Sequence, residues 1–458
     1  MLLSFRVSNF RSIRDEQELS LLRSTRASRG DAPATSTGSA SWDPQVGTVA
    51  GIYGANASGK SNVLQALLFM RAAVMDSYRE WKPDGRVPID KFAFDAKSKN
   101  EPSLFEVQIR LNKIRYQYGF RVMNERITNE WLYVYPGPRR QVWFERDTTA
   151  GEEYFFGKNF GGRNRTIAEF TRPNALFVST AIANNHKQLG PVYHWFNHHL
   201  RTATPDDRDS RTNYTLSLSG KKERWAEVAR MMRFADLGIE DIRVRHEDIP
   251  ADARQTLLSV FEAAASGSEK VRVDGVRDAD EFIRNISRVV EVAHRSAAVQ
   301  EPVYLPLANE SLGTQVWLAL IGPVLRVLGN SDTILIDELD ASLHPRLTAE
   351  ILSLFRDPEK NAKQAQIIFT THDTALLGTL LNETELQRDQ VWFTEKDADG
   401  ATVLYPLTDF APRKAENLER GYLQGRYGAI PMLDDRILLS VVRDLNQSSG
   451  EVQTGEDD

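Results

Sequence analysis

The segment GIYGANASGKSN, from Gly51 to Asn62, places two glycines, a lysine and a serine between an apolar run and an amphipathic one. Its central part, Gly54 to Ser61, fits the pattern G-x-x-x-x-G-K-[ST] of a phosphate-binding loop. Glycines allow the backbone to curl so that successive N–H groups point inward, and a helix N-terminus adds positive potential there. Residues 49–53 resemble a buried strand and residues 61–81 have helical spacing. This strand–loop–helix context disfavours the alternative of a glycine-rich turn that matches by chance.

Within this loop, each residue type suits a different part of a magnesium-bound triphosphate. The ammonium group of Lys60 would neutralise the β- and γ-phosphates of ATP, and the Ser61 hydroxyl would coordinate Mg²⁺. The backbone N–H groups of the loop would surround the phosphate oxygens. With ATP and Mg²⁺ as cofactors, the residues predicted to bind them in this loop are Asn56, Ala57, Ser58, Gly59, Lys60, Ser61 and Asn62.

A second motif, TILIDE from Thr333 to Glu338, places two carboxylates directly after apolar and β-branched residues. Such a run is typical of a buried strand, and open α/β sheets bind ligands at the carboxyl ends of their strands. We predict that Asp337 holds Mg²⁺ through water and that Glu338 orients and deprotonates the attacking water. The alternative, two surface acids at a strand end, is weakened by the presence of the phosphate loop in the same chain.

A third motif, FTTHD from Phe369 to Asp373, follows the buried run QIIF. His372 would lie at the carboxyl end of another strand, where a neutral imidazole can donate to the γ-phosphate and sense its presence. The alternative is a structural histidine. Glu338 and His372 are thus the predicted catalytic residues of a Mg²⁺-dependent ATPase, which converts ATP and water to ADP and phosphate.

Composition limits the classes of protein to be considered. With 458 residues, 41% of them hydrophobic and 26% charged, the chain has the make-up of a soluble globular protein of two or three units. Its net charge of −6 argues against nucleic-acid binding through overall charge but allows a local basic patch. The absence of cysteine excludes disulfides and thiolate metal sites. Since no apolar run approaches about 18 residues, we expect a cytoplasmic protein without a membrane span.

The pattern along the chain predicts an α/β fold in several units. Strand-like and helix-like runs alternate after residue 305, which indicates a parallel sheet. The runs LFEVQIRL, IRYQYGFRV and EWLYVYP alternate in polarity and indicate an antiparallel β-meander. The predicted units are 1–100, the N-terminal half of an ATPase head with the phosphate loop; 101–178, the β-meander; 179–300, a helical insertion; 301–445, the C-terminal half of the head; and 446–458, a disordered acidic tail.

The order of phosphate loop, serine–glycine segment, Asp-Glu pair and histidine resembles the head of ABC-class ATPases, which include SMC-like, RecF-like and OLD-like proteins. The serine–glycine signature corresponds to ESLGTQ, residues 310–315. The resemblance implies that Ser311 and Gly313 contact the γ-phosphate bound by the other subunit of a homodimer or higher oligomer. Leu312 and Thr314 depart from the usual signature residues, and the alternative for Ser311 is an ordinary helix cap. Residues 339–342 resemble the loop that touches the dimer partner.

A narrower resemblance is carried by NFRSIRDE, GIYGANASGKSN, ESLGT, IDELDASLHP, FTTHD, VWFTEKD and GRYGAIP. Together these segments are similar to bacterial abortive-infection ATPases of the RloA type. The resemblance implies a sensor or switch in antiviral (phage) defence that controls a separately encoded effector, often a Toprim-type nuclease. OLD-like relatives carry such a nuclease in the same chain, but the segment after His372 is too short for one. TEKDADG, residues 394–400, is instead interpreted as a hairpin loop.

Two other functions stay open. One is a RecF- or SMC-like ATPase of DNA repair or maintenance that binds DNA itself, and the other is a scaffold in which ATP joins subunits with little hydrolysis. The basic and aromatic residues between 139 and 172 are interleaved with acids, which favours a solvated β surface over a DNA site. Gln108 and Gln117 are candidates for the glutamine that ABC heads place near the γ-phosphate, although each is better explained as an exposed strand residue.

Overall fold

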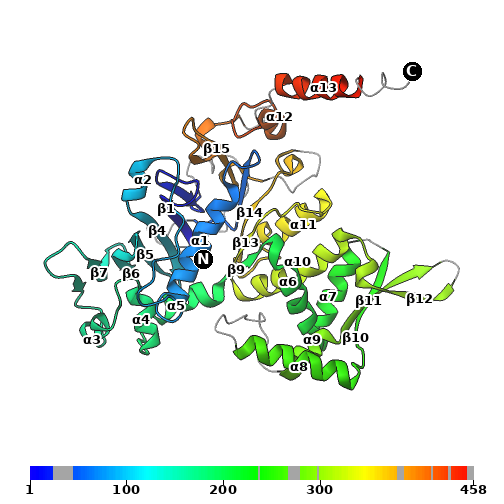
Figure 1. Cartoon of the computed structure of the whole chain (residues 1–458), viewed down its shortest axis with the longest axis horizontal. Helices are drawn as coiled ribbons and strands as arrows, with labels where there is room; N and C mark the ends of the chain where they lie inside the picture. Colours follow the sequence, from blue (N-terminus) through cyan, green and yellow to red (C-terminus); the bar gives the residue numbers. More distant parts are fainter. Residues whose placement is uncertain are drawn as a thin grey trace, which may run out of the picture.

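The structure is a computed structural model that describes residues 1–23, 45–235, 238–266, 279–296, 299–378, 386–413, 416–431 and 435–450. Within these residues the strands form three sheets, of six, seven and three strands. The mixed α/β architecture confirms the predicted fold class. Figure 1 shows the seven-stranded sheet on one side of helix α1 (Lys60–Asp76) and the helices that precede and follow the three-stranded sheet on the far side of the molecule.

The six-stranded core sheet has the order β16-β15-β3-β14-β13-β9. Its strands are β3 (Val49–Gly54), β9 (Leu200–Ala203), β13 (Thr333–Ile336), β14 (Gln366–Thr370), β15 (Val391–Lys396) and β16 (Thr402–Pro406). All pairs are parallel except β15 with β16, which form the hairpin predicted around 394–400. Every residue of β3, β13 and β14 is buried, as expected of parallel strands covered on both faces. The carboxyl ends of these three strands therefore meet at one edge.

The seven-stranded sheet is antiparallel and has the order β2-β1-β4-β5-β6-β7-β8. Its strands are β1 (Leu2–Ser8), β2 (Gln17–Ser20), β4 (Ser103–Leu111), β5 (Ile114–Met123), β6 (Arg126–Tyr135), β7 (Gln141–Asp147) and β8 (Tyr154–Phe156). The predicted meander is confirmed. Phe105 and Phe120 of this sheet share one hydrophobic core with Leu64 and Leu67 of α1 and with Ile52 of β3. Helix α1 is thereby held between the two large sheets.

The segment 179–300 was predicted to be helical, and this prediction is wrong in part. It contains β9, which pairs in parallel with β13 in the core sheet, and two strands of the three-stranded sheet, β10 (Ile239–His246) and β11 (Arg288–Ser296). The third strand, β12 (Val299–Pro306), pairs with β11. Tertiary pairing decided these strands, since each is short or rich in charged residues and lacks a clear apolar alternation. The boundaries of the predicted units are not tested by these contacts.

The longest helix, α10 (Leu312–Asn330), is the core helix of the second half of the molecule. Among the described residues it is the one helix long and apolar enough to meet the criteria for a membrane span, yet 56% of that stretch is buried inside the molecule. Trp317 on α10 donates from Nε1 to the carbonyl of Met231, and the amide of Gly322 donates to Thr215 Oγ1. These contacts dock α10 on α6 (Arg208–Ser217) and α7 (Lys222–Phe234). Such burial is expected of a core helix.

The remaining helices are α2 (Ala96–Asn100), α3 (Asn164–Glu169), α4 (Phe177–Ala183), α5 (Gly190–His194), a π-helix (Trp195–His199), α8 (Ala251–Ser266), α9 (Ala279–Ile286), α11 (Pro345–Arg356), α12 (Leu418–Leu423) and α13 (Asp435–Gly450). Helix α13 extends past residue 446, where the disordered tail was predicted to begin. The described part of this helix ends at Gly450. The rest of the predicted tail, residues 451–458, lies outside the described residues.

Candidate nucleotide-binding site

The phosphate loop connects the end of β3 to the start of α1, as the sequence predicts. Gly59, immediately before the helix, has a φ of 106°. A Cβ atom at Gly59 would lie 2.1 Å from Thr402 Oγ1, and one at Gly54 would lie 2.4 Å from the carbonyl oxygen of Thr394. Both positions thus require glycine, because the hairpin β15–β16 packs directly against the loop. The tight curl leaves the N-terminus of α1 facing the space where a polyphosphate would lie.

Two threonines of the neighbouring hairpin brace the loop. Ser58 Oγ is 2.7 Å from Thr394 Oγ1, and Thr402 Oγ1 donates to the carbonyl oxygen of Ser58 over 2.7 Å. The side chain of Asn62 donates to Ser12 Oγ over 2.6 Å. Asn62, predicted to bind nucleotide, therefore has its amide engaged with the turn after β1. Asn56 and Ala57, at the tip of the loop, are exposed.

The side chain of Lys60 lies across the phosphate loop and is only 6% exposed. Its Nζ donates to the carbonyl oxygens of Gly54, at 3.0 Å, and Ala55, at 3.2 Å. Burial lowers the pKa of Lys60, while the carboxylates of Glu338, Asp337 and Asp340 oppose this shift. The ammonium group is thus surrounded by carboxylates from the end of β13, as the predicted convergence of the two motifs requires.

Asp337 follows β13 and faces the first turn of α1. Ser61 Oγ donates to Asp337 Oδ1 over 2.9 Å, and Thr370 Oγ1 donates to the same oxygen over 2.6 Å. A hydroxyl and a carboxylate at hydrogen-bond distance are the oxygen donors that Mg²⁺ prefers when it also binds phosphate and water. These residues therefore fit the predicted metal site. No group of three or more His, Asp or Glu side chains with metal-site geometry occurs among the described residues, so this site would depend on substrate and water for its other ligands.

Glu338 is exposed and has a φ of 55°, in the left-handed region that a glutamate rarely adopts. Its backbone N–H donates to Thr370 Oγ1 over 2.8 Å. Thr370 thus orients both acidic residues, one through its side chain and one through its backbone. Thr370 belongs to the FTTHD motif, but the motif alone predicts no role for it. A strained backbone at an acidic residue beside a phosphate loop is typical of a functional position.

His372 is exposed, and its backbone N–H lies 3.3 Å from both carboxylate oxygens of Asp340. Partial desolvation and the positive charge of Lys60 lower the pKa of His372, which favours the neutral ring. A neutral imidazole has one N–H to donate, as the predicted role at the γ-phosphate requires. The loop after Glu338 therefore joins the histidine to the acidic pair.

The serine–glycine segment lies at the N-terminus of α10. Ser311 is exposed, and its Oγ accepts a hydrogen bond from the backbone N–H of Thr314 over 3.1 Å, so the helix-cap interpretation is correct for the single chain. A Cβ atom at Gly313 would lie 2.8 Å from the carbonyl oxygen of Ser342, in the loop that follows Glu338. Behind the cap, His294 Nε2 is 2.7 Å from Glu310 Oε1. The contact with a second subunit, predicted for Ser311 and Gly313, is not tested by one chain.

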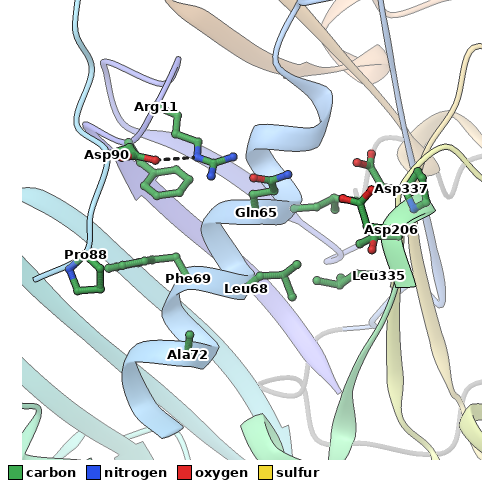
Figure 2. A pocket seen from close by; sticks show the side chains of 14 residues that line it. Arg11, Gln65, Leu68, Phe69, Ala72, Pro88, Asp90, Asp206, Leu335 and Asp337 are labelled. Carbon is green, nitrogen blue, oxygen red and sulfur yellow. Dashed lines mark ion pairs between the residues drawn. The ribbon is translucent and has the colours of Figure 1, made fainter. Parts of the chain in front are cut away.

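A cavity of about 530 Å³ opens beside α1 on the side of Asp337 (Figure 2). Its polar lining includes Gln65, Asp206 and Asp337, and its far wall carries the ion pair of Arg11 and Asp90, whose nitrogen and oxygen are 3.5 Å apart. Because Asp337 lines the cavity and Lys60 does not, the cavity adjoins the predicted Mg²⁺ ligand rather than the lysine of the phosphate loop. Asp206 comes from the turn after β9, a strand that the sequence analysis did not detect because only four residues of mixed polarity form it.

The two candidate glutamines lie on the antiparallel sheet. Gln117 on β5 donates to Glu106 Oε2 over 2.9 Å and accepts from the hydroxyl of Tyr135 over 2.8 Å. Gln108 lies opposite it in the β4–β5 register. Neither appears among the residues that surround Lys60 or Asp337. The segment next to Asp337 on the core sheet is instead the end of β9, where the amide of Asp337 donates to the carbonyl of Ala203.

Comparisons with known proteins concern the fold and the family. Among curated proteins no match is found. One solved structure similar to this chain is a Smc head bound to the C-terminal winged-helix domain of ScpA, with 12% identity, a TM-score of 0.44 and coverage of 89% of this chain and 98% of that one. Another is the Pyrococcus furiosus Smc head with an extended coiled coil, bound to the C-terminal domain of ScpA, with 12% identity, a TM-score of 0.34 and coverage of 89% and 97%.

A family model matches residues 49–378, from the first residue of β3 to a point beyond His372, and so contains the phosphate loop, the acidic pair and the histidine. The family is described as "AAA domain, putative AbiEii toxin, Type IV TA system". This match covers more than half of the chain. The parallel core sheet carries its phosphate loop and acidic pair at one carboxyl edge, as open α/β sheets that bind ligands do, and the chain belongs to this family of AAA domains.

Proposed function

We propose that this chain binds ATP with Mg²⁺ and hydrolyses it in a site that a second copy completes. The observation that carries the proposal is the hydrogen bond of 2.9 Å between Ser61 and Asp337, because it brings the phosphate loop and the acidic strand end to one point. Family membership supports the ATPase class. ATP would place its β- and γ-phosphates at Lys60 and the N-terminus of α1.

The residues suggest how the chemistry would proceed. When ATP binds, the ammonium group of Lys60 would exchange its two hydrogen bonds to loop carbonyl oxygens for hydrogen bonds to phosphate oxygens. The buried ammonium would then no longer depend on the loop for its acceptors. Ser61 and Asp337 would hold Mg²⁺, which supplies charge neutralisation for the phosphates when bound. Glu338 would accept a proton from the water that attacks the γ-phosphorus, and the bond to the ADP oxygen would break. His372 would donate its N–H to the γ-phosphate.

The participation of a second copy explains why Ser311 is exposed. Ser311 and Leu312 are exposed, and the loop at Ser342 touches Gly313 within the same chain. Closure over ATP therefore would bring Ser311 of one copy to the nucleotide of the other. Such closure requires contacts that ATP makes and ADP does not. A ligand that binds the open and closed states equally well does not change the equilibrium between them.

A mixing experiment tests this composite site. Lys60→Ala removes the phosphate contact and Ser311→Lys blocks the helix tip, so each variant alone should have little turnover. In an isologous dimer that combines the two, one site has an intact lysine from one copy and an intact serine from the other. An equimolar mixture should then recover up to about a quarter of wild-type turnover, since half the dimers are mixed and each keeps one of two sites. If no activity returns in mixtures that associate normally, the site is not shared.

We further propose that the ATPase cycle serves antiviral defence and controls a separately encoded effector. The support is the family's description as an AbiEii-type toxin domain, together with the RloA-like segments of the sequence. The test is phage survival of cells that express the chain with its neighbouring genes. Protection should require Lys60 and Glu338 and should fail when the effector gene is deleted. Protection by the Glu338→Gln chain at the wild-type level would contradict the role of hydrolysis.

A further inference from the structure

A cluster of arginine and histidine side chains lies near the amino ends of β9 and β13. The phosphate loop and the acidic pair lie at the carboxyl ends of the core strands instead. Arg201 is the second residue of β9 and pairs with Ile334 of β13. Arg326 comes from α10, and Arg71 comes from α1, where its Nε donates to the carbonyl of Phe196 over 2.9 Å. Three histidines from α5 and the following π-helix adjoin the arginines: His194, His198 and His199. The members thus come from five elements, namely β9, α10, α1, α5 and the π-helix.

The cluster has few compensating groups. The Nε atoms of Arg201 and Arg326 are buried and have no hydrogen-bond partner, and neither guanidinium forms an ion pair within the part of the chain that the structure describes. The nearby carboxylate of Asp332 is 2% exposed and is already bonded to His199, with 2.7 Å between Nδ1 and Oδ1. Arg326 lies over the ring of Tyr214, with 5.6 Å from Cζ to the ring centre. A buried N–H without an acceptor is destabilising, because it has lost its hydrogen bonds to water and gained none.

The electrostatic environment is consistent with this geometry. Burial and the charges of Arg326 and Arg71 lower the pKa of Arg201 to about 10, while Asp332 and Tyr214 oppose this shift. Desolvation and the neighbouring side chains of His194, Arg201, His199 and Arg326 lower the pKa of His198. Burial lowers the pKa of Arg71, and Asp76 opposes the shift. The site therefore gains free energy from any group that brings negative charge and hydrogen-bond acceptors.

We propose that Arg201 and Arg326, with the exposed His198 beside them, bind a phosphate group at a second site that is separate from the ATP site. Phosphate presents several acceptor oxygens and a charge of at least −1, and planar guanidinium groups match it in pairs. His198 is exposed and the side chain of His199 is 43% exposed, so the cluster is reachable from solvent. A free phosphate compound and a nucleic-acid backbone both present this group, and the experiment separates these two sources.

The experiment uses the full chain with Lys60→Ala, so that the ATP site contributes little. Arg201→Gln with Arg326→Gln removes the two charges, and Arg165→Gln with Arg224→Gln is the matched control, because both of those side chains are mostly exposed, at 85% and 53%. The probes are pyrophosphate, followed by the shift in melting temperature, and a labelled single strand of about 20 nucleotides, followed by anisotropy over a salt series. If the double variant fails to fold, Arg326→Gln alone carries the comparison.

We expect at least one probe to bind the control at least tenfold more tightly than it binds the cluster variant. We also expect the cluster variant to melt at the same or a higher temperature without ligand, because two unpaired buried donors are gone. Competition of pyrophosphate with DNA indicates recognition of the phosphate group itself, whereas DNA binding without a pyrophosphate effect indicates the nucleic-acid backbone. Equal binding by the cluster and control variants, or no binding of either probe, would overturn the proposal. A failed mixing experiment leaves this result unaffected.

Discussion

The phosphate loop and the serine–glycine segment differ in how completely one chain supports them. The loop is braced on its outer side by Thr394 and Thr402, and Thr370 fixes the acidic residues opposite it. The serine–glycine segment has a similar support behind it, through His294 and Glu310, but Ser311 faces solvent. In one copy of the chain the phosphate loop is therefore held by contacts on both sides, whereas the tip of α10 is supported on one side and exposed on the other. Because of this difference, we expect different substitutions to affect ATP binding, ATP hydrolysis and self-association separately.

The largest effect is expected from Glu338→Gln, which separates chemistry from binding. The variant should lower ATP turnover by on the order of 10²–10⁴-fold, because an amide cannot accept the proton of the attacking water. ATP affinity should be nearly unchanged, since Glu338 is exposed and makes its observed hydrogen bond through the backbone. Turnover under saturating ATP and equilibrium ATP binding are measured side by side.

A second substitution at the same position controls for backbone strain. Glu338→Gly relieves the left-handed φ of 55° and removes the carboxylate. It should be as inactive as Glu338→Gln but should melt at a higher temperature. Wild-type turnover in either variant would show that another group accepts the proton.

The sequence predicted the parts of this site that depend on local pattern. Buried parallel strands have continuous apolar sequences, so β3, β13 and β14 could be predicted from the sequence alone. The polar residues that follow them could then be assigned to the carboxyl edge of the sheet. The bracing contacts could not be predicted in this way, because Thr402 and Ser58 are separated by 344 residues. Strand β9 was missed because LRTA has no apolar alternation, and its place is set by pairing with β13. The site residues that no motif predicts are therefore those brought to the site by contacts between residues far apart in the sequence.

A smaller effect is expected when the support of the loop is weakened. Thr402→Val removes the hydroxyl that donates to the Ser58 carbonyl and contacts Ser12 Oγ at 2.8 Å. A buried carbonyl that loses its donor costs about 1–3 kcal/mol, so ATP affinity should fall roughly tenfold while the saturated turnover changes little. Thr402→Ser keeps the hydroxyl and is the matched control. Isothermal titration of ATP decides the outcome; a loss in Thr402→Ser with none in Thr402→Val would point to packing of the methyl group instead.

The smallest effect is expected behind the serine–glycine segment, and it falls on assembly. His294→Ala leaves the largely buried carboxylate of Glu310 without its partner, and Glu310 also offers its carbonyl to Gln315 Nε2 over 3.0 Å. Because the exposed segment can readjust, we expect the affinity of ATP-dependent self-association to fall only about threefold to tenfold, equivalent to roughly 1 kcal/mol. ATP affinity of the single chain should be unchanged, whereas the protein concentration needed for ATP-dependent self-association should rise. His294→Gln retains a donor and should restore most of the association. If His294→Ala instead weakens ATP binding by the single chain, then the two supports are coupled within one copy, and the division between the phosphate loop and the tip of α10 does not hold.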